Sequence, residues 1–186
     1  SPFSDAMAEK AMELIGENIR RFVANRTDVE AAEAMMVGSL FAGIAFSFAR
    51  LGNVHAMSHP VSAFFDVPHG VANAVLLPVV AEYNALADHG RYYKIYNYIS
   101  EIPAYEDEFE PMMLVDAIRS LCKAIGIPAN LTEAINQAGK TGSISRETIE
   151  EKIEAMAADA MKSGNIAVNP RSSRQCDIEM LYRKAL

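Results

Sequence analysis

The 186-residue sequence has very little cysteine. Its only two, Cys122 and Cys176, lie far apart, and neither belongs to a CxxC pair. We interpret both as free thiols that serve as small apolar residues, as in proteins of a reducing compartment. The chain also has no basic segment followed by an apolar leader, so nothing in it predicts secretion. We therefore expect a cytoplasmic protein.

Positive charge is scarce as well. The chain has 17 Lys and Arg against 24 Asp and Glu, a formal net charge of −7, and no cluster of basic residues. Neither a nucleic acid nor an anionic membrane surface is therefore an expected partner. The longest nearly uncharged stretch, residues 37–48, contains glycine and serine and ends before Arg50. We consider this stretch too short to span a bilayer.

No part of the sequence alternates apolar and polar residues, so strands are not predicted, whereas helical periodicity is present throughout. Half of the chain (51%) is hydrophobic, which is typical of a packed globule. We predict an all-α fold and, because no linker or repeat interrupts the chain, a single domain over residues 1–186. The expected helices run from Pro2 to near Asn25 and over residues 31–48, 54–65, 69–84, 88–100, 111–125, 131–138, 146–162 and 174–185.

Several helix ends are marked by the residues around them. Thr27 to Glu30 reads as a capping box for the second helix. That helix is apolar on nearly every side, so we expect it to be buried centrally. Residues 66–68 read as a turn and cap before the helix that starts at His69, and Pro78 is expected to kink that helix. Ser145 is a further candidate cap.

Three of the four histidines, His55, His59 and His69, fall within fifteen residues. On a helix His55 and His59 stand one turn apart and face the same way, and His69 sits at a Pro-His-Gly turn. Imidazole suits Zn, Fe, Cu and Ni, so the cluster is a candidate metal site. The spacing does not decide which of the three bind, and it supplies no further ligand. His89 reads as a surface loop residue with no assigned role.

A longer pattern surrounds these histidines. It consists of GIAFS at residues 43–47, LGNVHAMSHP at 51–60, PHGVANA at 68–74 and LP at 77–78, with SPFSD at 1–5, YN at 83–84 and NPR at 169–171. This pattern resembles the iron-containing (group III) alcohol dehydrogenases of the propanediol and butanol dehydrogenase type. The resemblance covers essentially the whole chain.

The resemblance implies a multi-helix domain like the C-terminal half of these enzymes, of the dehydroquinate synthase-like helical type. It implies that His55 and His69 bind a divalent metal, Fe²⁺ or Zn²⁺. His59 would not be a ligand but would lie beside the nicotinamide as a catalytic and cofactor-binding residue. Phe46 would line the substrate pocket, with plain core packing as the alternative. Phe48 departs from the pattern, since the family often has a polar Asn there.

The resemblance also implies parts that this sequence lacks. Family members carry an Asp-x-x-x-His helix before the position of Ser1, and an N-terminal nucleotide-binding domain with a glycine-rich turn. Such an enzyme uses NAD(P) to interconvert a small primary alcohol or diol and an aldehyde or ketone, and is expected to be a homo-oligomer. The chain alone is expected to be inactive and to hold no metal, or only a loosely bound one.

Two other classes of function are compatible with the residues. One is a helical metal-binding module that uses all three of His55, His59 and His69 as ligands. The other is a helical interaction domain in which these histidines are satisfied core residues. Metal loss from each single-histidine variant would favour the first alternative, and full stability after all three replacements would favour the second.

Overall fold

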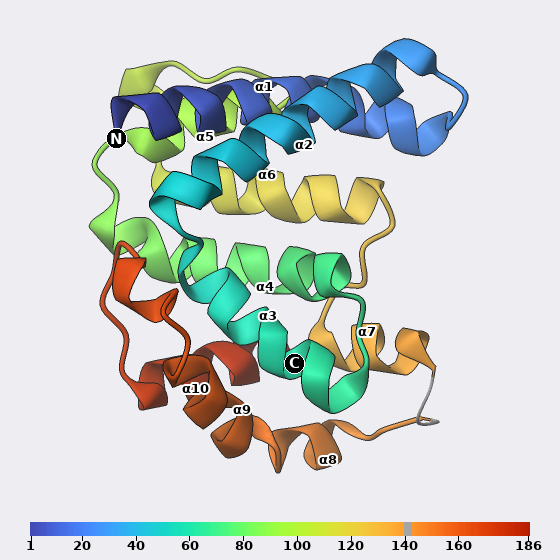
Figure 1. Ribbon diagram of the computed structural model, residues 1–186, viewed down its shortest axis with the longest axis vertical. Coiled ribbons are helices and arrows are strands. Elements are labelled where there is room, and N and C mark those ends of the chain that lie inside the picture. The colour runs from blue at the N-terminus through green and yellow to red at the C-terminus, as the bar shows by residue number, and fades with distance from the viewer. Residues whose placement is uncertain (140–142) are drawn as a thin grey trace. The chain divides into compact units, whose positions relative to one another are not determined.

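The computed structural model describes residues 1–139 and 143–186, and within these residues it contains helices and no strand. The predicted all-α class is confirmed. The helices and 3₁₀ turns, shown in Figure 1, are α1 (Pro2–Ala24), α2 (Val29–Ala49), α3 (Gly52–Phe65), α4 (His69–Asn84), η1 (Ala85–Ala87), α5 (Arg91–Ile99), η2 (Glu106–Glu108), α6 (Pro111–Ala124), α7 (Leu131–Ala138), α8 (Arg146–Glu150), α9 (Ile153–Met161), η3 (Ile166–Val168) and α10 (Gln175–Ala185).

The chain forms two compact units. Unit 1 consists of Ser1–Arg50 and Asp88–Ile125, and unit 2 of Leu51–Ala87 and Gly126–Leu186. The chain therefore starts in unit 1, enters unit 2 at Leu51, returns to unit 1 at Asp88 and enters unit 2 again at Gly126. A single domain over all 186 residues stays a prediction.

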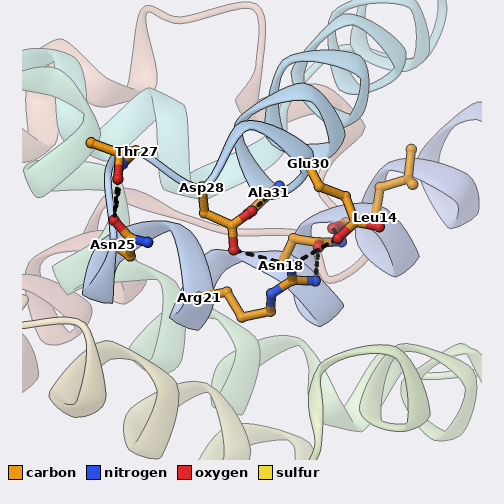
Figure 2. A network of polar contacts seen from close by, with 8 residues as sticks. All are labelled: Leu14, Asn18, Arg21, Asn25, Thr27, Asp28, Glu30 and Ala31. Atoms are coloured by element: carbon orange, nitrogen blue, oxygen red, sulfur yellow. Dashed lines mark hydrogen bonds and ion pairs between the residues drawn. The ribbon is translucent and has the colours of Figure 1, made fainter.

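Unit 1 is organised around α1, which packs against α2 and α5, while α5 packs against α6. A polar network closes the turn between α1 and α2, as Figure 2 shows. The guanidinium of Arg21 donates to Asp28 Oδ2 at 3.0 Å and to Glu30 Oε2 at 2.9 Å. Because Arg21 is half-exposed, its two ion pairs contribute mainly to the direction of the turn and little to the free energy of unfolding.

The cap of α2 differs from the predicted capping box. Asp28, not Thr27, is the N-cap, and its carboxylate accepts from the backbone N–H of Ala31 at 3.0 Å. Thr27 instead donates its hydroxyl to Asn25 Oδ1 at 2.8 Å. The pKa of Asp28 is lowered, first by the Ala31 hydrogen bond and then by Arg21. The predicted capping box began one residue too early, at Thr27, because Thr and Asp both cap helices well.

The central burial predicted for α2 is wrong. Its buried residues are all small and recur every seventh position, at Ala31, Gly38 and Ala45. The large apolar side chains of Met36 and Leu40 are 75% and 61% exposed. The small-residue face packs against α1, where Gly38 lies next to Ile15, since a close approach of two helices needs small side chains. An apolar helix is therefore not a buried helix unless neighbours surround it.

Two helical runs, α2 and His69–Ala87, are long and apolar enough to cross a membrane by length and composition alone. The second run belongs to the core of unit 2, where Val75, Leu76 and Val80 are buried. A core helix of a water-soluble protein passes the same test, so one or two such helices are weak evidence for a membrane protein.

A close approach of α1 to the end of α5 depends on Gly16. A Cβ atom at this position would lie 2.1 Å from the carbonyl oxygen of Tyr98, which is backbone and has little room to move. We expect Gly16→Ala to lower the free energy of unfolding by about 1–3 kcal/mol, because overpacking outweighs the gain in helix propensity. Urea unfolding followed by circular dichroism measures the change.

Gly43 provides the matched control, because it also lies inside a helix but a Cβ atom there would meet nothing within 4 Å. Gly43→Ala is expected to raise the free energy of unfolding by up to about 1 kcal/mol through helix propensity alone. A Gly16→Ala variant as stable as Gly43→Ala would contradict the close packing of α1 on α5.

Unit 2 contains the large hydrophobic core. Helix α3 packs against α4 and α9, α10 packs against α9 and α4, and α7 packs against α4. The phenol of Tyr182 is fully buried and donates to the backbone carbonyl of Met57 at 2.6 Å, which joins α10 to α3. The largest fully buried side chains of this core are Tyr182, Met57, Leu76, Leu131, Ile135, Ile149, Ile153, Met156, Ile178, Leu181 and Val61.

Two predicted helices have different bounds in the structure. The helix predicted over residues 146–162 is divided into α8 and α9 at Glu151–Lys152, where the hydrogen bonds shift to the tighter i→i+3 pattern. Ile149 of α8 and Ile153 of α9 both lie in the core, with 0% exposure each. The helix predicted from residue 88 starts at Arg91, because Gly90 has a left-handed φ of 84° and Asp88 accepts from the first N–H groups.

Asn169 ties the start of α3 to the end of α4. Its Oδ1 accepts from the backbone N–H of Asn53 at 3.1 Å, and its Nδ2 donates to Asn84 Oδ1 at 2.7 Å. Asn169 is 8% exposed, so these bonds are shielded from water. One side chain from the C-terminal part of the chain thus links the two helices that carry the histidines, in addition to their direct packing.

Candidate metal centre

The structure brings the three predicted histidines together in unit 2. Helix α3 carries His55 and His59, and α4 begins at His69. The ring centroid of His69 lies 5.2 Å from that of His55 and 5.2 Å from that of His59, while His55 and His59 are 6.3 Å apart. His55 is half-buried, whereas His59 and His69 are exposed. The clustering expected from the sequence is therefore present.

The short connection between α3 and α4 produces this arrangement. Helix α3 ends at Asp66, which adopts a left-handed φ of 56° and reverses the chain. Val67 is 2% exposed and anchors the turn in the core, and Pro68 precedes the first residue of α4. Asp66 thus caps the end of α3, whereas the sequence suggested a cap for the following helix. The reversal brings the ring of His69 within 5.2 Å of the rings of His55 and His59.

A fourth side chain, Asn73, lies between two of the imidazole rings. Its Nδ2 is 3.1 Å from Nε2 of His55 and 3.1 Å from Nε2 of His69. Sequence reasoning included Asn73 in the family pattern but gave it no role. Its position four residues after His69, one turn along α4, is the signal that could have singled it out.

The environment of His55 disfavours its charged form. The pKa of His55 is lowered from its usual value of 6.5, first by partial burial and then by the neighbouring His69 and His59. A neutral imidazole keeps a ring nitrogen lone pair available, which is the state that a metal ion requires. Burial and the crowding of three histidines therefore both favour the metal-binding form of His55.

This shift predicts a pH dependence of stability. Since the folded pKa of His55 lies below 6.5, the unfolded chain binds more protons below about pH 6.5. The free energy of unfolding should therefore be full above about pH 6.5 and fall as the pH drops through the folded pKa. Urea unfolding between about pH 7 and about pH 5 should show a shallower dependence in His55→Gln than in the parent chain. An equal pH dependence in His55→Gln and the parent chain would contradict this prediction. His89→Gln is the control and should behave like the parent.

The donors present fit part of a metal centre. Two imidazole nitrogens face the same carboxamide, and the carboxamide oxygen, Asn73 Oδ1, is buried without a hydrogen-bond partner among the described residues. Imidazole nitrogen with oxygen donors is a ligand set that suits Fe²⁺ and Zn²⁺. Over residues 1–139 and 143–186, no three His, Cys, Asp or Glu side chains are placed to hold one ion. A complete centre therefore needs further donors.

The predicted pocket residue, Phe46, belongs to unit 1 and lies on α2. It is 46% exposed, so it is not a core residue of that unit, and core packing there is not its role. Phe48 is 69% exposed, and its ring packs edge-on against Phe3 with the centroids 5.4 Å apart. Both side chains offer apolar surface outside the core.

Comparisons with known proteins agree with the resemblance seen in the sequence. The model of the Fe-containing alcohol dehydrogenase family, C-terminal part, matches residues 1–186. The chain is 37% identical over 186 residues to 1,3-propanediol dehydrogenase of Citrobacter freundii, covering 100% of the chain and 45% of the relative. It is 35% identical over 183 residues to lactaldehyde reductase of Escherichia coli (strain K12), covering 98% of the chain and 44% of the relative.

Solved structures show the same helical arrangement. A crystal structure of 1,3-propanediol oxidoreductase has a TM-score of 0.86 at 37% identity and covers 100% of this chain and 46% of the other. An alcohol dehydrogenase from Oenococcus oeni has a TM-score of 0.85 at 32% identity, with the same coverage. The chain thus spans about half the length of the relatives that it matches.

Proposed function

Because the chain belongs to the Fe-containing alcohol dehydrogenase family, we propose that it is the metal-binding part of an NAD(P)-dependent alcohol dehydrogenase. The reaction interconverts a small primary alcohol or diol and an aldehyde or ketone. The observation that carries this proposal is the convergence of His55 Nε2 and His69 Nε2 on one point, each 3.1 Å from the same carboxamide nitrogen. Relatives named for propanediol, lactaldehyde and butanol support the class of substrate.

In this proposal His55 and His69 hold the divalent metal through Nε2. A divalent metal held there would supply a Lewis acid for the substrate oxygen, and NAD(P) would supply the hydride chemistry. Partial burial of His55 lowers its pKa, which favours the neutral imidazole, and partly excludes water from that side of the centre. The Asn169 bonds link the start of α3, close to His55, to the end of α4.

His59 has a different role in the proposal. Its exposed ring stacks on the ring of His69, 5.2 Å between centroids, so it lies beside the ligands and is open to solvent. An imidazole accepts and releases protons at physiological pH, which suits a relay between the substrate hydroxyl and water. We assign the same side chain to the surface that meets the nicotinamide. Phe46, exposed on α2, is proposed to line the substrate pocket.

The remaining parts of the enzyme lie outside this chain in the proposal. A nucleotide-binding domain supplies NAD(P), and additional ligands, an Asp and a His, complete the centre for Fe²⁺ or Zn²⁺. We propose that the whole enzyme is a cytoplasmic homo-oligomer, since both cysteines are free thiols and α2 has exposed apolar side chains. Size-exclusion chromatography of the full-length protein would measure its oligomeric state.

A direct assay tests the proposed function. The full-length protein, supplied with Fe²⁺ or Zn²⁺, should reduce NAD or NADP with propanediol or butanol as the alcohol, and the 186-residue chain alone should not. The absence of turnover in a folded, metal-loaded full-length protein would contradict the proposed reaction. Turnover by the isolated chain would contradict the need for a nucleotide-binding domain.

A further inference from the structure

The carboxamide of Asn73 is the group on which two imidazole rings converge. It reaches His69 from one turn further along α4 and His55 from the neighbouring helix α3. The nitrogen carries two hydrogens, so it can donate one to each ring at the same time. Asn73 therefore bridges the two proposed metal ligands, which lie on different helices.

The direction of these bonds defines the state of both rings. A carboxamide N–H only donates, so each Nε2 must present its lone pair and carry no proton. The proton of each neutral ring then sits on Nδ1. In His69 this atom lies 3.5 Å from the hydroxyl oxygen of Ser58, which can accept a hydrogen bond from the Nδ1–H group. The lone pairs that Asn73 engages are the same ones that a metal ion would use.

The other end of the carboxamide has no such match. Asn73 Oδ1 is buried and has no hydrogen-bond partner within the part of the chain that the structure describes. A buried carbonyl oxygen without a partner is unfavourable. A cation bound to both Nε2 atoms would take over their lone pairs and repel the N–H hydrogens. A half-turn of the carboxamide would then exchange its nitrogen for its oxygen, so that Oδ1 gains the cation as a partner and the N–H hydrogens no longer face it, while the NH2 group takes the buried position that Oδ1 leaves.

We propose that Asn73 is a third residue of the metal centre. Its N–H groups hold the lone pairs of His55 and His69 toward one point, and its carboxamide turns when a cation binds so that Oδ1 faces the cation. Carbonyl oxygen is a suitable donor for Fe²⁺, and it is neutral, so the net charge of the site is unchanged. This inference rests on the proposed function, because it takes His55 and His69 as the ligands.

Co²⁺ titration of the 186-residue chain, followed by visible absorption, tests the proposal with the metal alone. Asn73→Leu keeps the volume but removes both polar atoms, and we expect Co²⁺ binding to weaken by about 10–100-fold. Asn73→Asp restores an oxygen donor with a charge, and it should bind Co²⁺ at least as tightly as the parent chain. Asn165→Leu is the matched control, since Asn165 lies in unit 2 and its backbone N–H bonds to Ser163 Oγ, and it should bind like the parent.

The outcomes separate this inference from the proposed function. Binding that is lost in His55→Ala but unchanged or tighter in Asn73→Leu overturns the role of Asn73 and leaves the ligand assignment standing. Binding that persists in His55→Ala overturns the ligand assignment itself.

A second measurement needs no metal. Nitrogen NMR of ¹⁵N-histidine-labelled chain should show the Nδ1–H form of both rings in the parent and a shift toward the Nε2–H form in Asn73→Leu. Unchanged ring forms in Asn73→Leu would overturn the bridging role even if the isolated chain binds Co²⁺ too weakly to titrate.

Discussion

Replacing His55 or His69 with alanine in the full-length protein is expected to remove the bound divalent metal and with it the dehydrogenase activity. Each replacement deletes a proposed metal ligand, so the metal affinity should fall by more than the roughly 10–100-fold typical of residues that only support a ligand. Metal content after dialysis, measured by elemental analysis, checks this result independently of turnover. The half-buried His55 also leaves a cavity, so circular dichroism should confirm that the variant is folded.

His59→Ala is expected to behave differently, because in the proposed function His59 is beside the metal and not bound to it. The variant should keep its metal and lose turnover by about 10²–10⁴-fold, the range of a positioned proton-transfer group. His89→Ala, a histidine outside the cluster at an exposed position, is the matched control and should change neither quantity. Comparing metal content with kcat in the same samples separates the two roles.

The same set of variants decides between the classes of function. Equal metal loss from His55→Ala, His59→Ala and His69→Ala would contradict the assignment of His59 and would favour a metal-binding module with three histidine ligands. Retention of metal in His55→Ala or His69→Ala would contradict the ligand pair. If the three variants are as stable as the parent protein and the parent itself holds no metal, an interaction domain would be favoured.

The second large effect concerns the core that supports the histidines. Tyr182 on α10 is fully buried, and its hydroxyl bonds to the carbonyl of Met57 on α3, two residues after His55. We expect Tyr182→Ala to lower the free energy of unfolding by about 3–5 kcal/mol through the loss of a large buried ring. That is a large part of the roughly 5–15 kcal/mol that stabilises a typical domain. Urea unfolding monitored by circular dichroism measures it.

Tyr182→Phe separates the hydrogen bond from the packing. It keeps the ring and removes only the hydroxyl, so the loss should be about 1 kcal/mol. Burial also raises the pKa of Tyr182 well above its usual range, so the phenol remains a donor at every ordinary pH. Tyr105→Ala is the control at a 74% exposed position and should change stability by less than about 0.5 kcal/mol. A Tyr182→Ala variant as stable as this control would contradict the core described for unit 2.

Local sequence signals were sufficient for most of the helices. The helices predicted over residues 69–84 and 131–138 have the same bounds in the structure, because Pro68 and Asn130 mark their starts. Ser145 caps α8 as predicted, with its hydroxyl accepting from the N–H of Thr148. Such signals are local, since a cap or a proline acts within one turn of the helix.

Local sequence signals predicted only part of the candidate site. The proximity of His55 and His59 follows from helical spacing, and the proximity of His69 from the short turn at Asp66. The bridge made by Asn73 was not predicted, because it joins side chains on two helices. Its geometry depends on the distance between α3 and α4, which packing in unit 2 sets.

The amino-acid sequence by itself determined the helical class, most helix bounds, the histidine cluster and the family resemblance, because periodicity, capping and motif spacing are properties of neighbouring residues. Only the tertiary structure decided which helix faces are buried. It showed α2 to be exposed along its large apolar side chains, the region 146–162 to be two helices, and Asn73 to lie between two imidazoles. Burial and side-chain convergence depend on which elements pack together, and that choice involves residues far apart in the chain.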